Sequence, residues 1–172
     1  NMLQSLFRSQ IQTLGATDYR IHPLTAMVDD AGRAALEKLA RERGRRFTHC
    51  GVGVADGPPN RPPLAVFIGV TRAVDLDPLP VRGPERGEIT LSGRTRLAVS
   101  ADLVAYLGRP DGSVSVLRRV AATPGASFAV PVRLGDAGRH ELELLVDKGR
   151  GPEVAVLLPV YVGVEPERVP VI

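Results

Sequence analysis

Short runs of alternating apolar and polar residues fill the chain from residue 87 to residue 164, and clusters of Gly, Pro or Asp separate them. This period of two predicts antiparallel strands near 88–92, 95–100, 102–108, 113–120, 127–134, 139–147 and 153–162. Short strands joined by tight turns are typical of a two-layer antiparallel β-sandwich. Because proline has no amide hydrogen, we expect the strands that carry Pro131 and Pro159 to lie at sheet edges or to bend there.

The first 75 residues show helical spacing instead. A helix is predicted over 2–14, where one stripe contains Leu3, Leu6, Phe7, Gln10, Ile11 and Leu14. A second helix is predicted from about Ala31 to Arg43, with Asp29 or Asp30 as its N-cap and Gly44 at its end. Residues 16–28 have no clear period and contain a proline, so no continuous element is predicted there.

Two strands are predicted after the second helix, over 47–54 and 64–72, with an exposed Pro-rich loop between them. Gly51 and Gly53 in the first strand predict either close packing by a helix or a β-bulge. The fold class is therefore predicted to be α+β, and we expect four segments: a small unit of two helices and a β-hairpin (1–75), a linker (76–86), an antiparallel β-sandwich (87–164) and a C-terminal linker or tail (165–172).

The composition argues against one class of function, nucleic-acid binding. Aromatic residues make up only 4% of the chain and Trp is absent, so a base-stacking platform for nucleic acid is not expected. The formal net charge is only +3, and the one dense group of cations is Arg41, Arg43, Arg45 and Arg46. These arginines are candidates for contact with phosphate or with an acidic protein surface. The favoured interpretation is that they complement the helix C-terminal dipole and stay solvated.

Cys50 is the only cysteine, so no intrachain disulfide can form. A free cysteine is usually buried and inert, and we expect this of Cys50. His49 is its neighbour on a predicted strand and therefore points to the opposite face, so the two cannot form a nucleophilic pair. An enzyme, or an enzyme-regulatory domain, that uses Cys50, His49 or His22 in a cleft between the two units is kept as the alternative.

No metal, cofactor or membrane span is expected. The three histidines are isolated, which does not provide the ligand spacing of a transition-metal site. A calcium site formed by Asp75 and Asp77 with Asp102 or Asp111 is a weaker alternative to turn and linker roles, because the spacing matches no calcium loop. No apolar run reaches the roughly 18 residues that cross a bilayer.

The segment Asp136-Ala137-Gly138-Arg139-His140-Glu141-Leu142 resembles the corner before the sixth strand of immunoglobulin-like domains. His140 stands at the tyrosine position of that corner, and Leu142 stands where antibody domains have a cysteine. The family's buried Trp and disulfide are missing from this chain. The resemblance implies a structural His140 whose ring nitrogen is hydrogen-bonded to the backbone near Asp136.

A second resemblance covers 45–72. The run Thr48-His49-Cys50-Gly51-Val52-Gly53-Val54-Ala55 resembles the closing hairpin of bacterial CAP-domain (SCP-like) proteins, and the whole chain is similar to the accessory region beside such domains in secreted bacterial proteins. The chain lacks the helices that would supply most of the CAP family's paired His and Glu residues, so no CAP active site is carried over. The resemblance implies an extracytoplasmic, non-catalytic location.

The sequence thus predicts a non-enzymatic bacterial structural or protein-binding module. Asn1 precedes Met2, and the tail resembles a linker, so we expect a piece of a longer protein. The partner is expected to be a protein or a neighbouring domain and not nucleic acid, whereas the sequence does not determine the oligomeric state. Candidate contacts lie at edge strands and end loops. They include Arg109 and Asp111 in one turn, the Gly149–Pro152 turn, the Pro-rich loop 57–63 and the arginines of 41–46.

Overall fold

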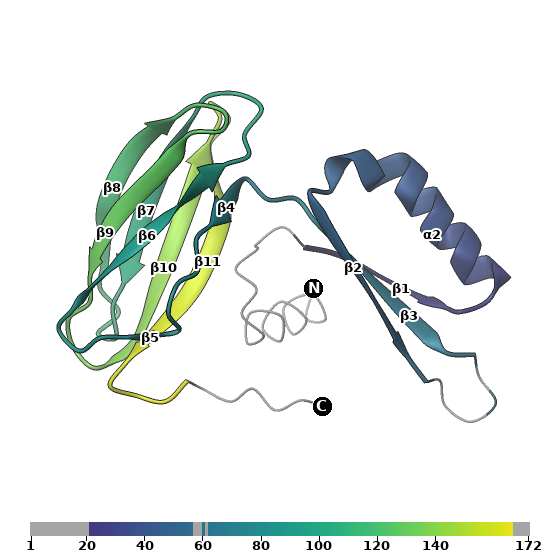
Figure 1. The fold of residues 1–172 in the computed structure, drawn as a ribbon, viewed down its shortest axis with the longest axis horizontal. Helices are drawn as coiled ribbons and strands as arrows, with labels where there is room; N and C mark the ends of the chain where they lie inside the picture. The colour runs from purple at the N-terminus through teal and green to yellow at the C-terminus, as the bar shows by residue number, and fades with distance from the viewer. Residues whose placement is uncertain (1–20, 57–59, 61, 167–172) are drawn as a thin grey trace. The chain divides into compact units, whose positions relative to one another are not determined.

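The chain is mostly β in a computed structural model that describes residues 21–56, 60 and 62–166. The described residues form two compact units, 21–72 (the first unit) and 73–166 (the second unit; Figure 1). One α-helix lies among these residues, where the sequence predicts two in the chain. The helix predicted over 2–14 falls outside the described residues.

The first unit is a three-stranded antiparallel sheet with one helix. Its elements are β1 (Ile21–Met27), α2 (Asp30–Arg43), the 3-10 turn η1 (Gly44–Arg46), β2 (His49–Ala55) and β3 (Leu64–Val70). The strand order is β1-β3-β2, so β3 is central. The sequence analysis missed β1, in which Pro23 pairs with Ile68. An edge strand tolerates a proline because one row of its amides needs no partner strand.

The helix α2 confirms the predicted cap. Asp29 is the N-cap residue, and its Oδ1 accepts a hydrogen bond of 2.7 Å from the Gly32 amide. Gly44 has φ −55°, so the helix does not end in a left-handed turn but tightens directly into η1. The first turn of α2 lies against β1, since a Cβ atom at Gly32 would be only 1.8 Å from the Met27 carbonyl oxygen.

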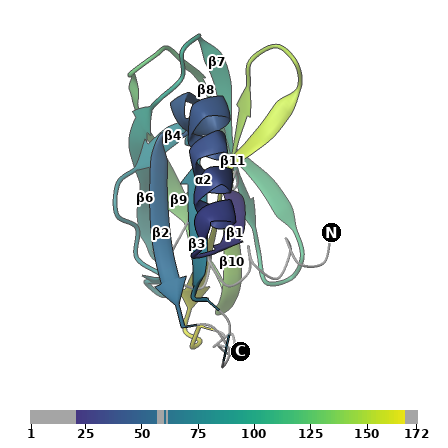
Figure 2. The same cartoon turned by 90° about the vertical axis from the view of Figure 1, so that its right-hand side faces the viewer.

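The helix covers only part of the sheet. The face toward α2 (the helix-side face) carries Ala26 and Ala65, and a Cβ atom at Gly32 would lie 3.2 Å from the Ala26 Cβ. Farther along this face the Phe47 ring lies over Gly69, where a Cβ atom would be 2.7 Å from the ring. In Figure 2 α2 passes in front of β1 and β3, whereas β2 lies to its side. Among the described residues, α2 therefore does not cover β2.

The second unit contains two sheets. Its strands are β4 (Val74–Leu76), β5 (Arg82–Gly83), β6 (Glu88–Thr95), β7 (Ala101–Gly108), β8 (Val114–Ala122), β9 (Ser127–Arg133), β10 (Gly138–Asp147) and β11 (Pro152–Val162). One sheet has the order β5-β11-β10-β7-β8 and the other β4-β6-β9. Residues 76–86 are therefore not only a linker, because β4 and β5 belong to these sheets. The strand predicted over 95–100 is instead the end of β6 followed by a bend.

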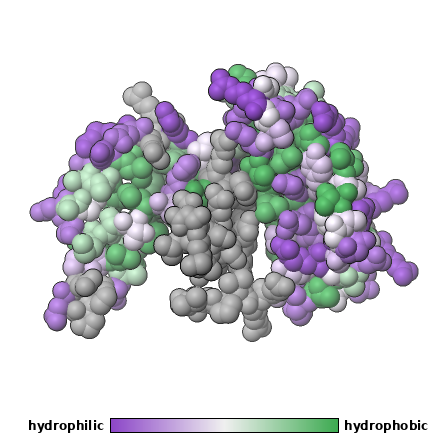
Figure 3. Space-filling model, turned by 180° about the vertical axis from the view of Figure 1, so that it is seen from behind, coloured by the Kyte–Doolittle hydropathy of each residue, from purple (hydrophilic) through white to green (hydrophobic). Residues whose placement is uncertain are grey.

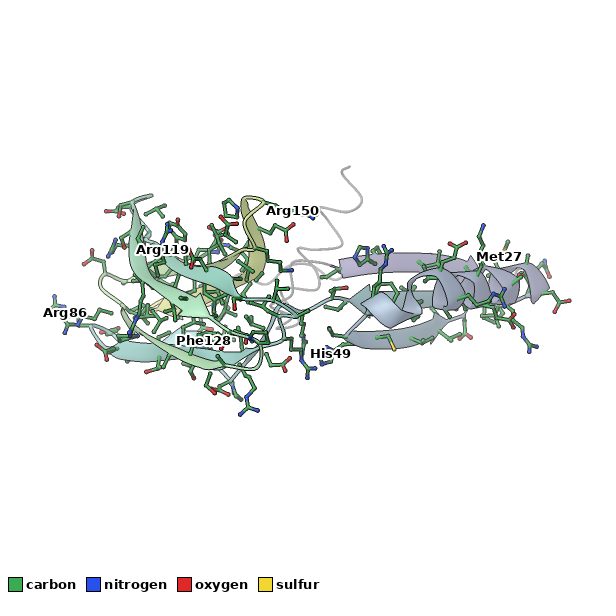
Figure 4. The ribbon with its side chains drawn as sticks, turned by 90° about the horizontal axis from the view of Figure 1, so that it is seen from above. Met27, His49, Arg86, Arg119, Phe128 and Arg150 are labelled. Atoms are coloured by element: carbon green, nitrogen blue, oxygen red, sulfur yellow. The ribbon has the colours of Figure 1, made fainter. Side chains whose placement is uncertain are left out.

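Both sheets contribute to one aliphatic core. Inward residues alternate along each long strand, and those of the two sheets form a single buried cluster. Its largest fully buried aliphatic side chains are Leu91, Leu103, Leu107, Leu142 and Leu144. Phe128 of β9 points into the same layer (Figure 4). This part of the sequence interpretation is confirmed, because the period of two assigns the inward positions correctly.

Candidate functional site

The residues of the proposed thiol chemistry do not converge. Cys50 is an exposed free thiol, so the expectation of a buried cysteine is wrong. His22 and Cys50 both pair in register with Gly69, from opposite sides of β3. The Phe47 ring lies over Gly69, and its centroid is 5.6 Å from that of His22. An aromatic ring therefore lies over the position between the histidine and the thiol.

His49 lies on the opposite face of the sheet from Cys50, as adjacent strand residues must. Its Nδ1 is 3.1 Å from the Thr48 hydroxyl, and its Nε2 is 3.4 Å from Nη1 of Arg72. Figure 4 shows His49 at one end of the first unit's sheet. These contacts stabilise the start of β2. At the same place the Thr48 hydroxyl donates a hydrogen bond to the Val70 carbonyl oxygen.

The carboxylates considered for calcium each have a partner of their own. Asp75 pairs with Arg96, and Asp77 accepts a 2.6 Å hydrogen bond from the Ser92 hydroxyl. Asp102 pairs with Arg119 at 3.7 Å. Within the described ranges no group of three or more His, Cys, Asp or Glu residues could hold a metal ion. These carboxylates therefore act in local ion pairs and turns.

A shallow depression at one end of the second unit brings together Ser100–Asp102, Ala121–Thr123 and Asp147–Gly149. Its two carboxylates are engaged. Asp102 has the Arg119 ion pair, and Asp147 Oδ1 accepts hydrogen bonds from the Gly149 and Gly151 amides at 2.7 and 3.2 Å. Amide donors to an Asp two and four residues earlier stabilise a turn. Both carboxylates of the depression are therefore already paired, and neither is available as a catalytic acid or base.

The arginine cluster is partly described. Arg41 is exposed on α2, and its Nη1 lies 3.6 Å from Glu37. The backbone carbonyl of Arg46 accepts a 2.8 Å hydrogen bond from the Thr71 hydroxyl. The side chains of Arg43 and Arg45 lie outside the described part of the chain. An exposed pair one helical turn apart contributes little stability and leaves Arg41 in contact with water.

Arg109 and Asp111 stabilise the turn between β7 and β8. Gly112 has φ +83° and donates to the Arg109 carbonyl oxygen at 3.0 Å, which closes the predicted reverse turn. The Ser113 amide donates to Asp111 Oδ1 at 2.8 Å. The pKa of Asp111 lies below its ordinary value, because the Ser113 hydroxyl and amide hydrogen-bond to the carboxylate and Arg109 adds positive charge. The two residues therefore have a structural role in the turn.

His140 is buried on the inner side of β10, with 0% of its surface exposed. Neither ring nitrogen has a hydrogen-bond partner among the described residues, so the bond to the backbone near Asp136 that the tyrosine-corner resemblance implies is absent. Asp136 itself is exposed in the turn before β10. A buried polar group without a partner costs roughly 1–3 kcal/mol. His140 is thus a polar residue in the core of the second unit, and we expect it to lower the stability of that unit.

Replacing His140 with leucine should therefore raise the free energy of unfolding of the second unit by about 1–2 kcal/mol at neutral pH, because two unpaired nitrogens leave the core. Hydrogen exchange of β10 amides, measured by mass spectrometry, reports this change. The control is His22→Leu, the same replacement at an exposed site, where we expect less than about 0.5 kcal/mol. Lower protection in His140→Leu would contradict the assignment.

The sequence analysis did not single out the most exposed apolar residues of the first unit, which lie on β2. Val52 and Val54 are each 66% exposed, on the same helix-side face as Cys50. Figure 3 shows apolar residues gathered in patches at the surface of the molecule. The sequence feature that could have indicated this exposed edge is the run from Cys50 to Ala55, which contains no charged residue and no proline.

The other sheet edges are protected. The edge strands β4 and β5 have only three and two residues. Pro23 lies on β1 and Pro131 on β9, while β8 carries Arg118 and Arg119. Short length, proline and charge are the means by which proteins keep edge strands from pairing with other chains. The described sheets have six edge strands. Among them β2 is the one that is neither short nor interrupted by a proline nor charged.

The chain matches no protein-family model, and a search of curated proteins finds no match either. No helix in the described ranges is long and apolar enough to cross a membrane.

Proposed function

We propose that the chain is a non-enzymatic structural or protein-binding module, and that β2 is its interaction surface. The observation that carries this proposal is the exposed seven-residue edge, on which Val52 and Val54 are each 66% exposed and no described element covers them. A free strand edge binds a partner through backbone hydrogen bonds, and its side chains give the selectivity. Exposed apolar residues beside such an edge mark an interaction site in a soluble protein.

In this proposal the second unit is an immunoglobulin-like sandwich that serves as a rigid support. The order of its strands supports this fold. The sheet β4-β6-β9 corresponds to strands A, B and E, and β8-β7-β10-β11 corresponds to C′, C, F and G. A single buried aliphatic core that joins both sheets suits a spacer or accessory region.

The arrangement of the first unit's candidate residues supports a role without catalysis. A thiol nucleophile needs a base within hydrogen-bond reach, but Phe47 lies over the position between Cys50 and His22. The resemblance over 45–72 to bacterial CAP-domain proteins supports an extracytoplasmic accessory region of a longer bacterial protein as the setting. The partner is then a protein or a neighbouring domain, and no cofactor is required.

The reactivity of Cys50 tests the proposal against the enzyme alternative. Under native conditions at pH 7 we expect Cys50 to react with a thiol reagent at the rate of an unstructured peptide cysteine, within a factor of about three, because it is exposed, His49 lies on the opposite face and His22 lies across β3. The His22→Ala and His49→Ala variants should react at the same rate. A rate at least tenfold higher that falls in either histidine variant would support a catalytic thiol and contradict the proposal.

A further inference from the structure

The two glycines of β2 contact no side chain among the described residues. A Cβ atom at Gly51 or Gly53 would meet nothing within 4 Å, and β2 pairs with β3 without a register shift. The expected β-bulge is therefore wrong, and in the described part of the chain no helix packs on these glycines. A strand glycine that neither packs nor bends the chain leaves space for another backbone to approach. The edge is thus both unprotected and sterically open.

The sequence of β2 is symmetric about Val52. Gly51 and Gly53 flank it, Cys50 and Val54 lie one step farther out on the same face, and the ends are His49 and Ala55. When an antiparallel copy is placed with Val52 opposite Val52, each glycine faces a glycine and each cysteine faces a valine. This register brings no two like charges together, because β2 contains no Asp, Glu, Lys or Arg.

We propose that β2 pairs with β2 of a second copy of this chain, antiparallel, about a two-fold axis that passes between the two Val52 residues. This inference deepens the proposed function, because it names the partner of the same edge. The pairing joins two three-stranded sheets into one sheet of the order β1-β3-β2-β2-β3-β1. An isologous contact of this kind closes on itself and gives a dimer.

The apolar side chains support the same register. The two-fold axis is perpendicular to the sheet, so both α2 helices lie on one face, with the β2 strands between them. Val52 and Val54 of both copies then form a continuous row of β-branched residues, which pack well across neighbouring strands. The pairing of one strand buries less than the roughly 1,200 Å² of a standard interface. We therefore expect a weak, reversible dimer that forms only at high protein concentration.

Sedimentation equilibrium of the full chain tests this inference. The unmodified protein should sediment as a dimer at high concentration, and Val52→Lys should remain a monomer because two lysines would meet at the axis. The matched control is Val116→Lys on β8, where the valine is 62% exposed and the edge already carries arginines; it should dimerise like the unmodified protein. Circular dichroism should show that all variants keep their secondary structure, and Val54→Lys replaces Val52→Lys should the latter unfold.

Mixing two charge variants tests the position of the axis. Val52→Lys and Val52→Glu should each be monomeric alone, and an equimolar mixture should form a heterodimer because opposite charges then face each other. A monomeric unmodified protein, or a Val52→Lys dimer, would overturn the inference while leaving the non-enzymatic function intact. Conversely, a highly reactive, histidine-dependent Cys50 would contradict the function, whatever the oligomeric state.

The native cysteine reports the register independently. With Val52 at the axis, Cys50 faces Val54 of the second copy, so the two Cys50 Cα atoms are about 14 Å apart across the strand pair. Spin labels on Cys50 should give a short inter-chain distance in the unmodified protein and none in Val52→Lys. A dimer in which the labels are more than about 40 Å apart would place the interface elsewhere and overturn the inference.

Discussion

Replacing Leu142 with alanine should lower the free energy of unfolding of the second unit by about 3–4 kcal/mol. Leu142 lies on β10, which pairs with β7 on one side and β11 on the other, and its side chain is fully buried. Removing it takes methyl groups out of the core and leaves a cavity that two flanking strands prevent from collapsing. Hydrogen exchange of β10 amides measures the loss for this unit separately from the first unit.

The control for this prediction is Val114→Ala. Val114 lies on β8 and is exposed, so we expect less than about 0.5 kcal/mol. A loss below about 1 kcal/mol in Leu142→Ala would mean that the two sheets can close around the gap, which is inconsistent with a rigid support.

Replacing Gly93 with alanine should cost the second unit about 3 kcal/mol and release β4 from β6. A Cβ atom at Gly93 would lie 2.1 Å from the Asp75 carbonyl oxygen and 3.0 Å from the Leu76 Cα. Both atoms belong to the backbone of β4, so no rotamer change relieves the overlap and the strand must move. The ion pair between Asp75 and Arg96 should be lost with it.

The result is measured as faster hydrogen exchange in β4 and in the β6 residues that face it. Gly108→Ala is the matched control, since it also introduces a methyl group into a strand of the second unit, where its nearest neighbour would be the Glu141 Cβ at an ordinary 3.6 Å. It should leave its own unit unchanged or slightly more stable, because alanine restricts the unfolded chain more than glycine does. Unchanged protection of β4 in Gly93→Ala would show that β4 does not pack closely on β6.

The elements that the sequence predicts well are those with local causes. The helix α2 has its cap in Asp29, one turn before the amide that it binds. The long strands of the second unit follow from the period of two, which assigns inward positions such as Leu142 and Leu144. By contrast, β4 and β5 have three and two residues, too few to show a period, and they exist only because β6 and β11 offer partners.

The candidate site was less predictable because exposure depends on tertiary arrangement. A cysteine within an apolar strand is usually buried, yet Cys50 is exposed because α2 covers β1 and β3 and not β2. His140 was placed correctly at the start of β10, but whether its nitrogens meet a backbone partner depends on the path of the preceding turn. Neither outcome is determined by neighbouring residues in the sequence.

The parallel pairing of β5 with β11 has a mechanical consequence. Tyr161 and Val162 pair with Arg82 and Gly83, and the Tyr161 amide donates to the Val81 carbonyl oxygen at 2.8 Å. Arg82 also pairs with Glu165 just beyond β11. Tension that reaches these two strands from the chain ends pulls them in opposite directions along their length. The bonds between them are then loaded in shear and share the force, whereas a pair pulled open from one end breaks one bond at a time.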